Sequence, residues 1–403
     1  TVDLAGVSIG YNIWIALYTF MMGILLGITP IVSQLLGGRK IKHIGNITKE
    51  GLYIATGLAL LLWLLGYFGM KPFLLYLNME PAAYEICVFY LKAFSIDLFP
   101  ILWGCTLRNI IDSHGLTHFS MAIVVFGFVL NVFFNYALIF GHFGLPELGG
   151  IGAGYATAIT CWSNFILYSL VLIFHPTFKE YNIFSNWKLP SWTYIREQLQ
   201  IGLPIGFSIF FETSIFSIAG LLMVQFGTAV VAAHQSALSF TNIFYCFPLS
   251  ISMAATIAVA YELGAGKPKE ARQYAYIARI FALIVATLLC SYSFTHMENI
   301  AGLFTSDPVV FDLIMSFLSY AVFFAVIDAF GTPLQGILRA YKDVRIISYI
   351  SLFSYWGVCF PVAYILSRMP EYGPYGVWIG LLSSVSVAGI LFTARAWYIQ
   401  HKR

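Results

Sequence analysis

Charged residues are scarce in this chain of 403 residues. They make up 10% of it, whereas hydrophobic residues make up 60%. A soluble protein of ordinary composition carries about a quarter charged residues, so the composition excludes a water-soluble fold. The six cysteines form no CxxC pair and mostly fall inside apolar stretches. We therefore expect buried thiols that take part in no disulfide and bind no metal.

Motifs of enzymes are absent as well. The sequence holds no HExxH, GxSxG or dinucleotide-binding pattern. The Gly-rich turn at 264–268 is not a P-loop, because Tyr261 stands where the first Gly would be and Pro268 replaces the Ser or Thr. We therefore predict that the protein is not an enzyme and needs no cofactor, so that any energy input comes from an ion gradient.

What the chain has instead is a series of eleven continuous apolar runs. Each is long enough to cross a bilayer, which takes about 20 residues. Continuous runs indicate helices, since the strands of membrane barrels are shorter and alternate in polarity. The predicted fold class is an all-α polytopic membrane protein. The runs cover 7–36, 51–77, 84–111, 119–140, 152–174, 200–226, 229–262, 271–296, 309–338, 347–367 and 376–397.

The basic residues fall on one side of the predicted membrane. All but three of the 21 Lys and Arg lie in connections or helix ends that share a side, and the exceptions are Lys71, Lys92 and Arg368. Basic residues mark the cytoplasmic side of membrane proteins. We therefore expect a multi-pass protein of the cell inner (plasma) membrane with a cytoplasmic C-terminus. Arg339 is counted among the cytoplasmic residues.

One stretch of the chain occurs twice. Residues 96–112 read IDLFPILWGCTLRNIID, and residues 327–343 read IDAFGTPLQGILRAYKD. Both copies place an acid, Asp97 or Asp328, at the same distance before an arginine. Further matches at a similar offset run through the chain in the same membrane direction, which indicates a parallel duplication.

The duplication predicts two lobes of six helices each. We expect an N-lobe at 1–174, a cytoplasmic linker at 175–198 and a C-lobe at 199–403. The helix near 200–226 has its counterpart before residue 1. We therefore expect that the intact protein has twelve helices and that the first is missing from this sequence.

Three acids lie inside predicted helices. Counted from the cytoplasmic ends of their helices, Glu212, Asp328 and Asp97 all fall about 15 Å deep at a rise of 1.5 Å per residue. A charge at a helix centre costs about 2.5–3.5 kcal/mol on insertion scales, so such acids face the bundle interior or a cavity. The alternative is a protonated carboxyl that joins two helices. That alternative weighs more for Asp97, which Lys92 could neutralise.

Glu212 and Asp328 form the candidate site for a coupling cation. We expect no basic residue near the middle of the C-lobe to pair with them, so they would take up a proton or hold a cation. Carboxylate oxygens suit hard cations, and two acids can share one Na+, which favours Na+ over H+. Aromatic faces attract organic ammonium ions. The candidate substrate-lining residues are Phe211, Phe324, Gln235 and Asn242.

Two further acids have less specific interpretations. Asp97 is a candidate for an additional cavity acid. Asp307 precedes Pro308, so it is expected to cap the following helix. The competing interpretation is that Asp307 attracts cations to an outward cavity.

At these residues the sequence resembles the MATE (multidrug and toxic compound extrusion) family, and its NorM-like branch in particular. The similar stretches run across nearly the whole chain in family order. They are GITPIVSQLLGG (27–38), NVFFNYALIFG (131–141), GGIGAGYATAI (149–159), GLPIGFSIFFE (202–212), AAHQSALSF (232–240), FPLSISMAATIAVAYELGAG (247–266) and IDAFGTPLQGILRAYKD (327–343).

The resemblance implies two six-helix lobes around a central cavity and alternating access, in which organic cations leave as Na+ or H+ enters. Glu212 and Asp328 match the family's two C-lobe acids and would form the coupling-cation site. The family's acid in the first helix has no position in this sequence. Asp97 is not part of the family pattern and comes from the repeat alone.

The predicted function is therefore a multidrug efflux antiporter that exports organic cations in exchange for Na+ or H+. We expect a monomer in the lipid bilayer, with small organic cations as substrates and no nucleic acid as partner. The alternative within transport is a flippase for lipids or lipid-linked oligosaccharides, which should carry a basic cavity for pyrophosphate. The alternative of another class is an ion channel, which would need no alternating states.

Overall fold

The computed structural model describes residues 15, 17–76, 81–185, 187 and 189–402, and these residues contain helices and no strands. In this part of the chain, ten helical segments are long and apolar enough to cross a membrane. The protein is therefore an all-α polytopic membrane protein. The chain divides into two compact units, the N-terminal unit at 1–206 and the C-terminal unit at 207–403.

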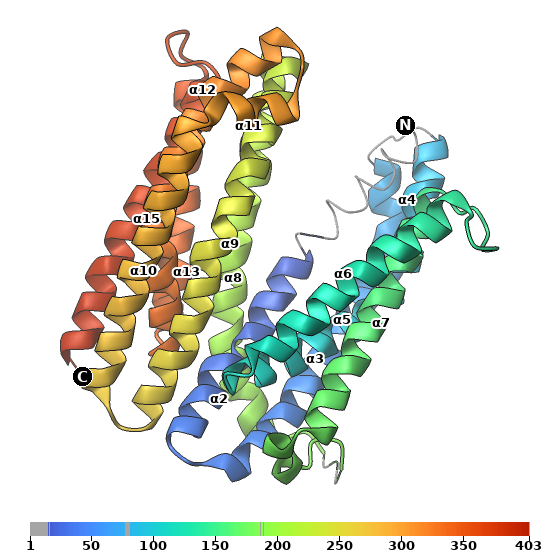
Figure 1. Cartoon of the computed structure of the whole chain (residues 1–403), viewed down its shortest axis with the longest axis vertical. Coiled ribbons are helices and arrows are strands. Elements are labelled where there is room, and N and C mark those ends of the chain that lie inside the picture. The colour runs from blue at the N-terminus through green and yellow to red at the C-terminus, as the bar shows by residue number, and fades with distance from the viewer. Residues whose placement is uncertain (1–14, 16, 77–80, 186, 188, 403) are drawn as a thin grey trace. The chain divides into compact units, whose positions relative to one another are not determined.

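The N-terminal unit is built from a first span, Leu17–Gly37, and the helices that follow it (Figure 1). The helix α8 (Trp192–Met223) begins in this unit and ends in the next. The other elements are α2 (Ile28–Gly37) within the first span, the 3₁₀ helix η1 (Ile41–His43), α3 (Ile44–Tyr76), α4 (Pro81–Phe94), α5 (Leu98–Ser113), α6 (Thr117–Phe140), α7 (Gly150–Phe174) and the 3₁₀ helix η2 (Pro176–Tyr181).

The C-terminal unit is arranged around α12 (Pro308–Ala340), which packs against three other long helices, α9, α10 and α15 (Figure 1). The other elements are the 3₁₀ helix η3 (Val224–Phe226), α9 (Thr228–Gly264), α10 (Pro268–Thr295), α11 (Met297–Phe304), α13 (Val344–Ser351), the π-helix η4 (Leu352–Cys359), α14 (Phe360–Ser367) and α15 (Tyr375–Lys402).

The expected span at 84–111 is broken into α4 and α5. Pro100 has no N–H, so it cannot donate to the Ile96 carbonyl, and its ring disfavours a continuous helix at this point. The indole N–H of Trp162 on α7 donates to that carbonyl instead, at 3.2 Å. The break between the two helices therefore has a local cause in Pro100, and a neighbouring helix satisfies the freed backbone group.

Small residues bring α9 and α12 close together. A side chain at Gly336 would overlap the Ser252 backbone carbonyl. The Ser252 hydroxyl donates to the Thr332 carbonyl and the Thr256 hydroxyl to the Gly336 carbonyl, both at 2.9 Å. Small residues and hydroxyls of this kind hold helices together in membranes, where there is no hydrophobic drive between them. This contact fixes the position of α12 against α9.

Candidate functional site

One face of α12 is polar along its second half. Asp328, Thr332, Gln335 and Arg339 follow one another at intervals of four, three and four residues, which places them on one face of a helix. We call these four residues the polar column. Their exposed fractions are 6%, 3%, 3% and 4%, respectively. Burying two ionisable and two polar side chains inside a membrane bundle is costly and marks a functional site.

Glu212 of α8 faces the polar column and is 8% exposed. Its carboxylate interacts with the side chain of Gln335 and with the charge of Arg339. It also interacts electrostatically with the Asp328 carboxylate. The structure therefore brings the two predicted acids together, and Glu212 lies against the stretch of α12 between Asp328 and Arg339.

The expectation that no basic residue approaches this pair was wrong. Arg339 is buried, and its Nη2 donates to the Gln335 Oε1 at 3.2 Å. Its Nε is also buried and has no hydrogen-bond partner among the described residues. An arginine side chain stays protonated in proteins, so the site contains one fixed positive charge, which interacts with the Glu212 carboxylate. The sequence count had assigned this residue to the cytoplasmic surface.

The orientation of Arg339 has a cause at the end of the repeated stretch. Asp343, four residues later, would be its natural partner on a helix surface. However, Asp343 accepts two hydrogen bonds from Arg395 of α15, from Nε at 2.6 Å and from Nη2 at 3.2 Å. A bidentate pair of this kind is strong. Asp343 is therefore paired with Arg395, while Arg339 lies along the buried face of α12 and donates a hydrogen bond to Gln335.

Two tyrosines complete the surroundings of the acids. The side chain of Tyr245 on α9 interacts with the Glu212 carboxylate. Tyr355 on the π-helix η4 is 2% exposed and interacts electrostatically with Glu212 and Asp328. Sequence reasoning missed both, because nothing distinguishes them among the 25 tyrosines of the chain. The π-helix that carries Tyr355 is a rare conformation that often occurs at functional sites.

The site offers oxygen donors to a ligand. Thr332 is buried, and its side chain interacts with the Asp328 carboxylate. With the carboxylates, the Gln335 amide oxygen and the Tyr245 hydroxyl, these are the donors that hard cations prefer. No cluster of three His, Cys, Asp or Glu side chains occurs in the described ranges. Oxygen donors of this kind suit hard cations better than soft transition metals.

The structure places the predicted substrate-lining residues in different settings. Phe324 lies one turn before Asp328 on α12, is 3% exposed and packs edge to face on Phe216 at 5.8 Å. Phe211 is partly buried and stacks on the neighbouring Phe207 at 6.1 Å. Gln235 and Asn242 are exposed on α9. These four residues remain predictions as parts of a binding surface.

Asp307 caps α12. Its Oδ1 accepts the backbone N–H groups of Val309 at 2.8 Å and Val310 at 3.4 Å, and Pro308 occupies the first helical position. This arrangement satisfies two of the free donors at the helix start. The predicted capping role is confirmed, and a role in attracting cations remains a prediction.

Asp97 is a buried acid in the N-terminal unit. It lies at the break between α4 and α5 and is 0% exposed. The Cys161 thiol donates to its Oδ2 at 3.8 Å, while Oδ1 has no hydrogen-bond partner in the described part of the chain. The exposed Lys92 does not neutralise it, because its ammonium group lies over the Phe89 ring, 5.3 Å from the ring centre. The Tyr18 side chain interacts with Asp97 electrostatically, but Ile101 and Gly104 stand where the other unit has Thr332 and Gln335.

Comparisons with known proteins agree with this architecture. The chain is 38% identical over 402 residues to a probable multidrug resistance protein NorM of Oceanobacillus iheyensis, covering 99% of this chain and 90% of the relative. It is 40% identical over 388 residues to a probable NorM of Bacillus subtilis, covering 96% and 86%.

Solved structures share the fold. A crystal structure of MATE in complex with MaL6 matches with a TM-score of 0.90 at 18% identity, covering 100% of this chain and 89% of that one. An outward-facing multidrug resistance MATE family transporter matches with a TM-score of 0.89 at 19% identity, covering 99% and 88%. The model of the MatE family matches residues 1–137 and 204–365. The chain therefore belongs to the MatE family, and its relatives place it in the NorM-like branch.

Proposed function

We propose that this protein is a multidrug efflux antiporter that exports organic cations in exchange for Na+ or H+. The observation that carries the proposal is the pair of buried carboxyl groups, Glu212 of α8 and Asp328 of α12, which interact electrostatically. The names of the relatives, multidrug resistance proteins, support export of several substrates. The oxygen donors around the pair favour Na+ as the coupling ion.

The mechanism follows from competition for the two carboxyl groups. Glu212 and Asp328 bind either the coupling cation or the drug, but not both at full strength. A cation that enters from outside therefore displaces the drug. A ligand shifts an equilibrium between two access states only through its different affinity for the two states. The shared carboxyl groups supply that difference in affinity. Alternating access then leads to exchange of the drug for the coupling cation.

The setting of the protein is part of the proposal. Lys and Arg follow the positive-inside pattern in the connections between spans, which supports a cytoplasmic C-terminus and insertion in the plasma membrane. We propose that the working unit is a monomer. Asp97 is proposed only as an additional acid of the N-terminal unit, since its neighbours are the Cys161 thiol and the Tyr18 side chain.

A flippase for pyrophosphate-linked lipids is the weaker alternative. Such a protein needs an excess of positive charge to hold the pyrophosphate. Arg339 does bring one positive charge to the site, but Glu212 and Asp328 outnumber it. A channel would conduct ions without exchange, and recordings of single-channel current would detect it.

The test is drug flux in proteoliposomes that hold a fluorescent organic cation. We expect a Na+ gradient alone to drive export, and we expect Glu212→Gln and Asp328→Asn each to abolish it. Glu298→Gln at an exposed position of α11 is the matched control, and it should export normally. Export driven by a pH gradient alone would overturn the choice of Na+. Unchanged export in both acid variants would overturn the site.

A further inference from the structure

Arg339 poses a problem of charge balance. The residue is 4% exposed, its Nη2 donates to the neutral Gln335 amide oxygen at 3.2 Å, and its Nε has no partner in the described residues. An unpaired charge inside a bundle is very costly, so buried charges are paired. The carboxylate that interacts with Arg339 is that of Glu212.

The repeat shows that this arrangement is specific to the C-terminal unit. The equivalent arginine of the N-terminal unit, Arg108, forms an ion pair with Asp112 at 3.4 Å, and its side chain is 44% exposed. In the C-terminal unit the equivalent acid, Asp343, is held by Arg395 instead. Arg395 therefore takes away the outward partner of Arg339 and leaves its charge to the buried site.

We propose that Arg339 is the resident counter-ion of the cation site, and that it limits this site to one monovalent cation at a time. The inference rests on the proposed function of Glu212 and Asp328. When both carboxyl groups are ionised, they and the one guanidinium leave a single net negative charge. One Na+ ion or one singly charged drug neutralises that charge, and no net negative charge then remains to bind a second cation.

The groups around the site support this count. Tyr245 and Tyr355 are the other titratable side chains that interact with the two acids, and a tyrosine is neutral near pH 7. Thr332 and Gln335 carry no charge. The charge of the site therefore depends on Glu212, Asp328 and Arg339.

The limit to one cation has a consequence for transport. Exchange of one singly charged drug for one Na+ moves no net charge across the membrane. The rate should then be insensitive to the membrane potential, since the potential acts only on net charge that moves. Without Arg339 the site would carry two negative charges and would take up a second cation, and exchange of a singly charged drug would become sensitive to the potential.

The experiment measures Na+ binding to the purified protein and drug flux under a K+ diffusion potential. We expect the unmodified protein to bind one Na+ and to exchange a singly charged drug at a rate independent of the potential. Arg339→Met should make the flux depend on the potential and should raise the amount of Na+ bound, because the site would then take up a second cation. Arg108→Met, which removes the equivalent arginine from the N-terminal unit, is the matched control and should change neither.

A second variant keeps Arg339 in the chain. Arg395→Met frees Asp343, which can then pair with Arg339 as Asp112 pairs with Arg108. We expect the same change as in Arg339→Met, but smaller. This variant keeps the inference testable if Arg339→Met fails to fold.

A compensating variant separates this inference from the proposed function. Glu212→Gln alone leaves one carboxylate and one guanidinium, and hence no net negative charge at the site, so Na+ binding should be lost. Adding Arg339→Met restores one net negative charge, so we expect Na+ affinity to recover by at least about tenfold, or ~1.4 kcal/mol. Loss of binding in Glu212→Gln without recovery in the double variant would overturn the counter-ion and leave the cation site intact. Unchanged binding in both Glu212→Gln and Asp328→Asn would overturn the site itself.

Discussion

The two copies of the repeated stretch share the residues at their two ends and differ in the residues between them. Both begin with a buried acid and reach an arginine after the same number of residues. In the C-terminal unit Thr332 and Gln335 fill the face between Asp328 and Arg339. In the N-terminal unit the equivalent positions hold Ile101 and Gly104. One copy therefore forms a continuous polar face on an unbroken helix, and the other places its acid at a helix break.

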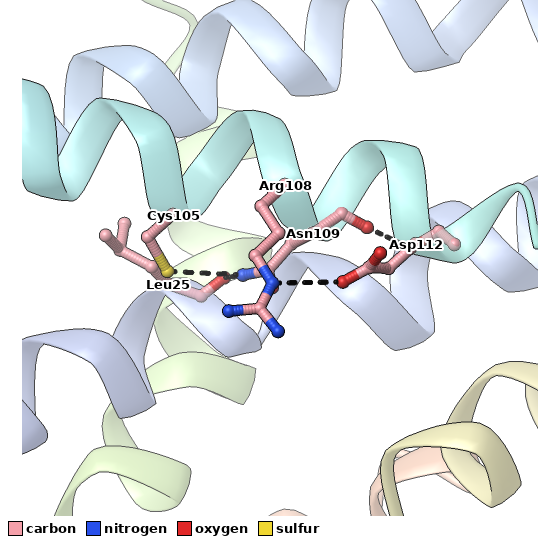
Figure 2. Close-up of polar contacts among 6 residues, drawn as sticks. Leu25, Cys105, Arg108, Asn109 and Asp112 are labelled. Carbon is pink, nitrogen blue, oxygen red and sulfur yellow. Dashed lines mark hydrogen bonds and ion pairs between the residues drawn. The ribbon is translucent and has the colours of Figure 1, made fainter. Parts of the chain in front are cut away.

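The arginines at the ends of the copies also behave differently. Figure 2 shows Arg108 turned toward Asp112 at the end of α5, with the Asn109 amide directed to the Leu25 carbonyl and the Cys105 sulfur. In the other copy the aspartate bonds to Arg395, and Arg339 is buried. The aspartate that ends each copy therefore has a different arginine partner, and the repeated arginine is exposed in one copy and buried in the other.

The largest expected effect comes from the acids themselves. If only the C-terminal copy binds the coupling cation, Asp328→Asn should lower coupled drug export by about 100-fold or more, which corresponds to losing ~2.7 kcal/mol of interaction. Asp97→Asn should retain most of the export, because Asn keeps the volume of the buried side chain. Both are measured as initial rates in proteoliposomes at equal protein content. Equal losses in the two variants would show that both copies work.

The next effect concerns the middle of the polar column. Gln335→Leu removes the amide that interacts with both Glu212 and Arg339. Hydrogen bonds to charged groups contribute about 1.5–3 kcal/mol, so Na+ affinity should fall by roughly tenfold to 100-fold. The equivalent change in the other copy is Gly104→Ala, where an added methyl meets Tyr168 at an ordinary 3.7 Å. Titration with Na+ should show no loss there; a comparable loss would place Gly104 in the same site.

The packing that supports the column should be sensitive to volume. Gly336→Ala would push a methyl group into the Ser252 carbonyl, and overpacking of this kind costs about 1–3 kcal/mol. Thermal unfolding in detergent should therefore occur at a clearly lower temperature. Gly331→Ala on the same helix is the control, since its methyl would lie 3.5 Å from Gly389. If the two variants unfolded alike, the close approach of α9 and α12 would not be the feature that matters.

Much of this architecture follows from the sequence because its signals are local. Apolar length predicted the spans, and the depth of the acids in their helices predicted that Glu212 and Asp328 belong together. The break at Ser95–Asp97 was missed, because it needs Pro100 and also Trp162 of a distant helix to take the freed carbonyl. Conversely, the spacing of Asp328, Thr332, Gln335 and Arg339 is visible in the sequence and could have revealed the polar column.

Arg339 shows where sequence reasoning must fail. Counting basic residues near the ends of apolar runs assigns each one to a surface. That rule ignores partners, and here the partner Asp343 is taken by Arg395 from the end of the chain. The burial of Arg339 is therefore a tertiary effect. It becomes visible only when α12 and α15 are placed side by side.

The smallest expected effect lies just beyond the N-terminal copy, at His114, whose equivalent in the other copy is Arg345. The Nδ1–H of His114 donates to the Ile110 carbonyl at 2.7 Å, and its Nε2 accepts from the Tyr181 hydroxyl at 2.8 Å. Burial lowers the pKa of His114, and the nearby His175 lowers it further. The folded imidazole therefore resists protonation, while the unfolded one takes up a proton below about pH 6.5.

Stability should consequently fall as the pH drops below that value, because the unfolded state then binds more protons than the folded state. His114→Phe removes this dependence and loses the Tyr181 hydrogen bond, at about 1 kcal/mol. Thermal unfolding of both proteins near neutral and at mildly acidic pH measures the difference, with His401→Phe at an exposed position of α15 as control. If His114→Phe lost as much stability at acidic pH as the unmodified protein, a group other than His114 would cause the acid sensitivity. Its loss would show that the end of the N-terminal copy is held by a neutral histidine, where the C-terminal copy carries a fixed positive charge.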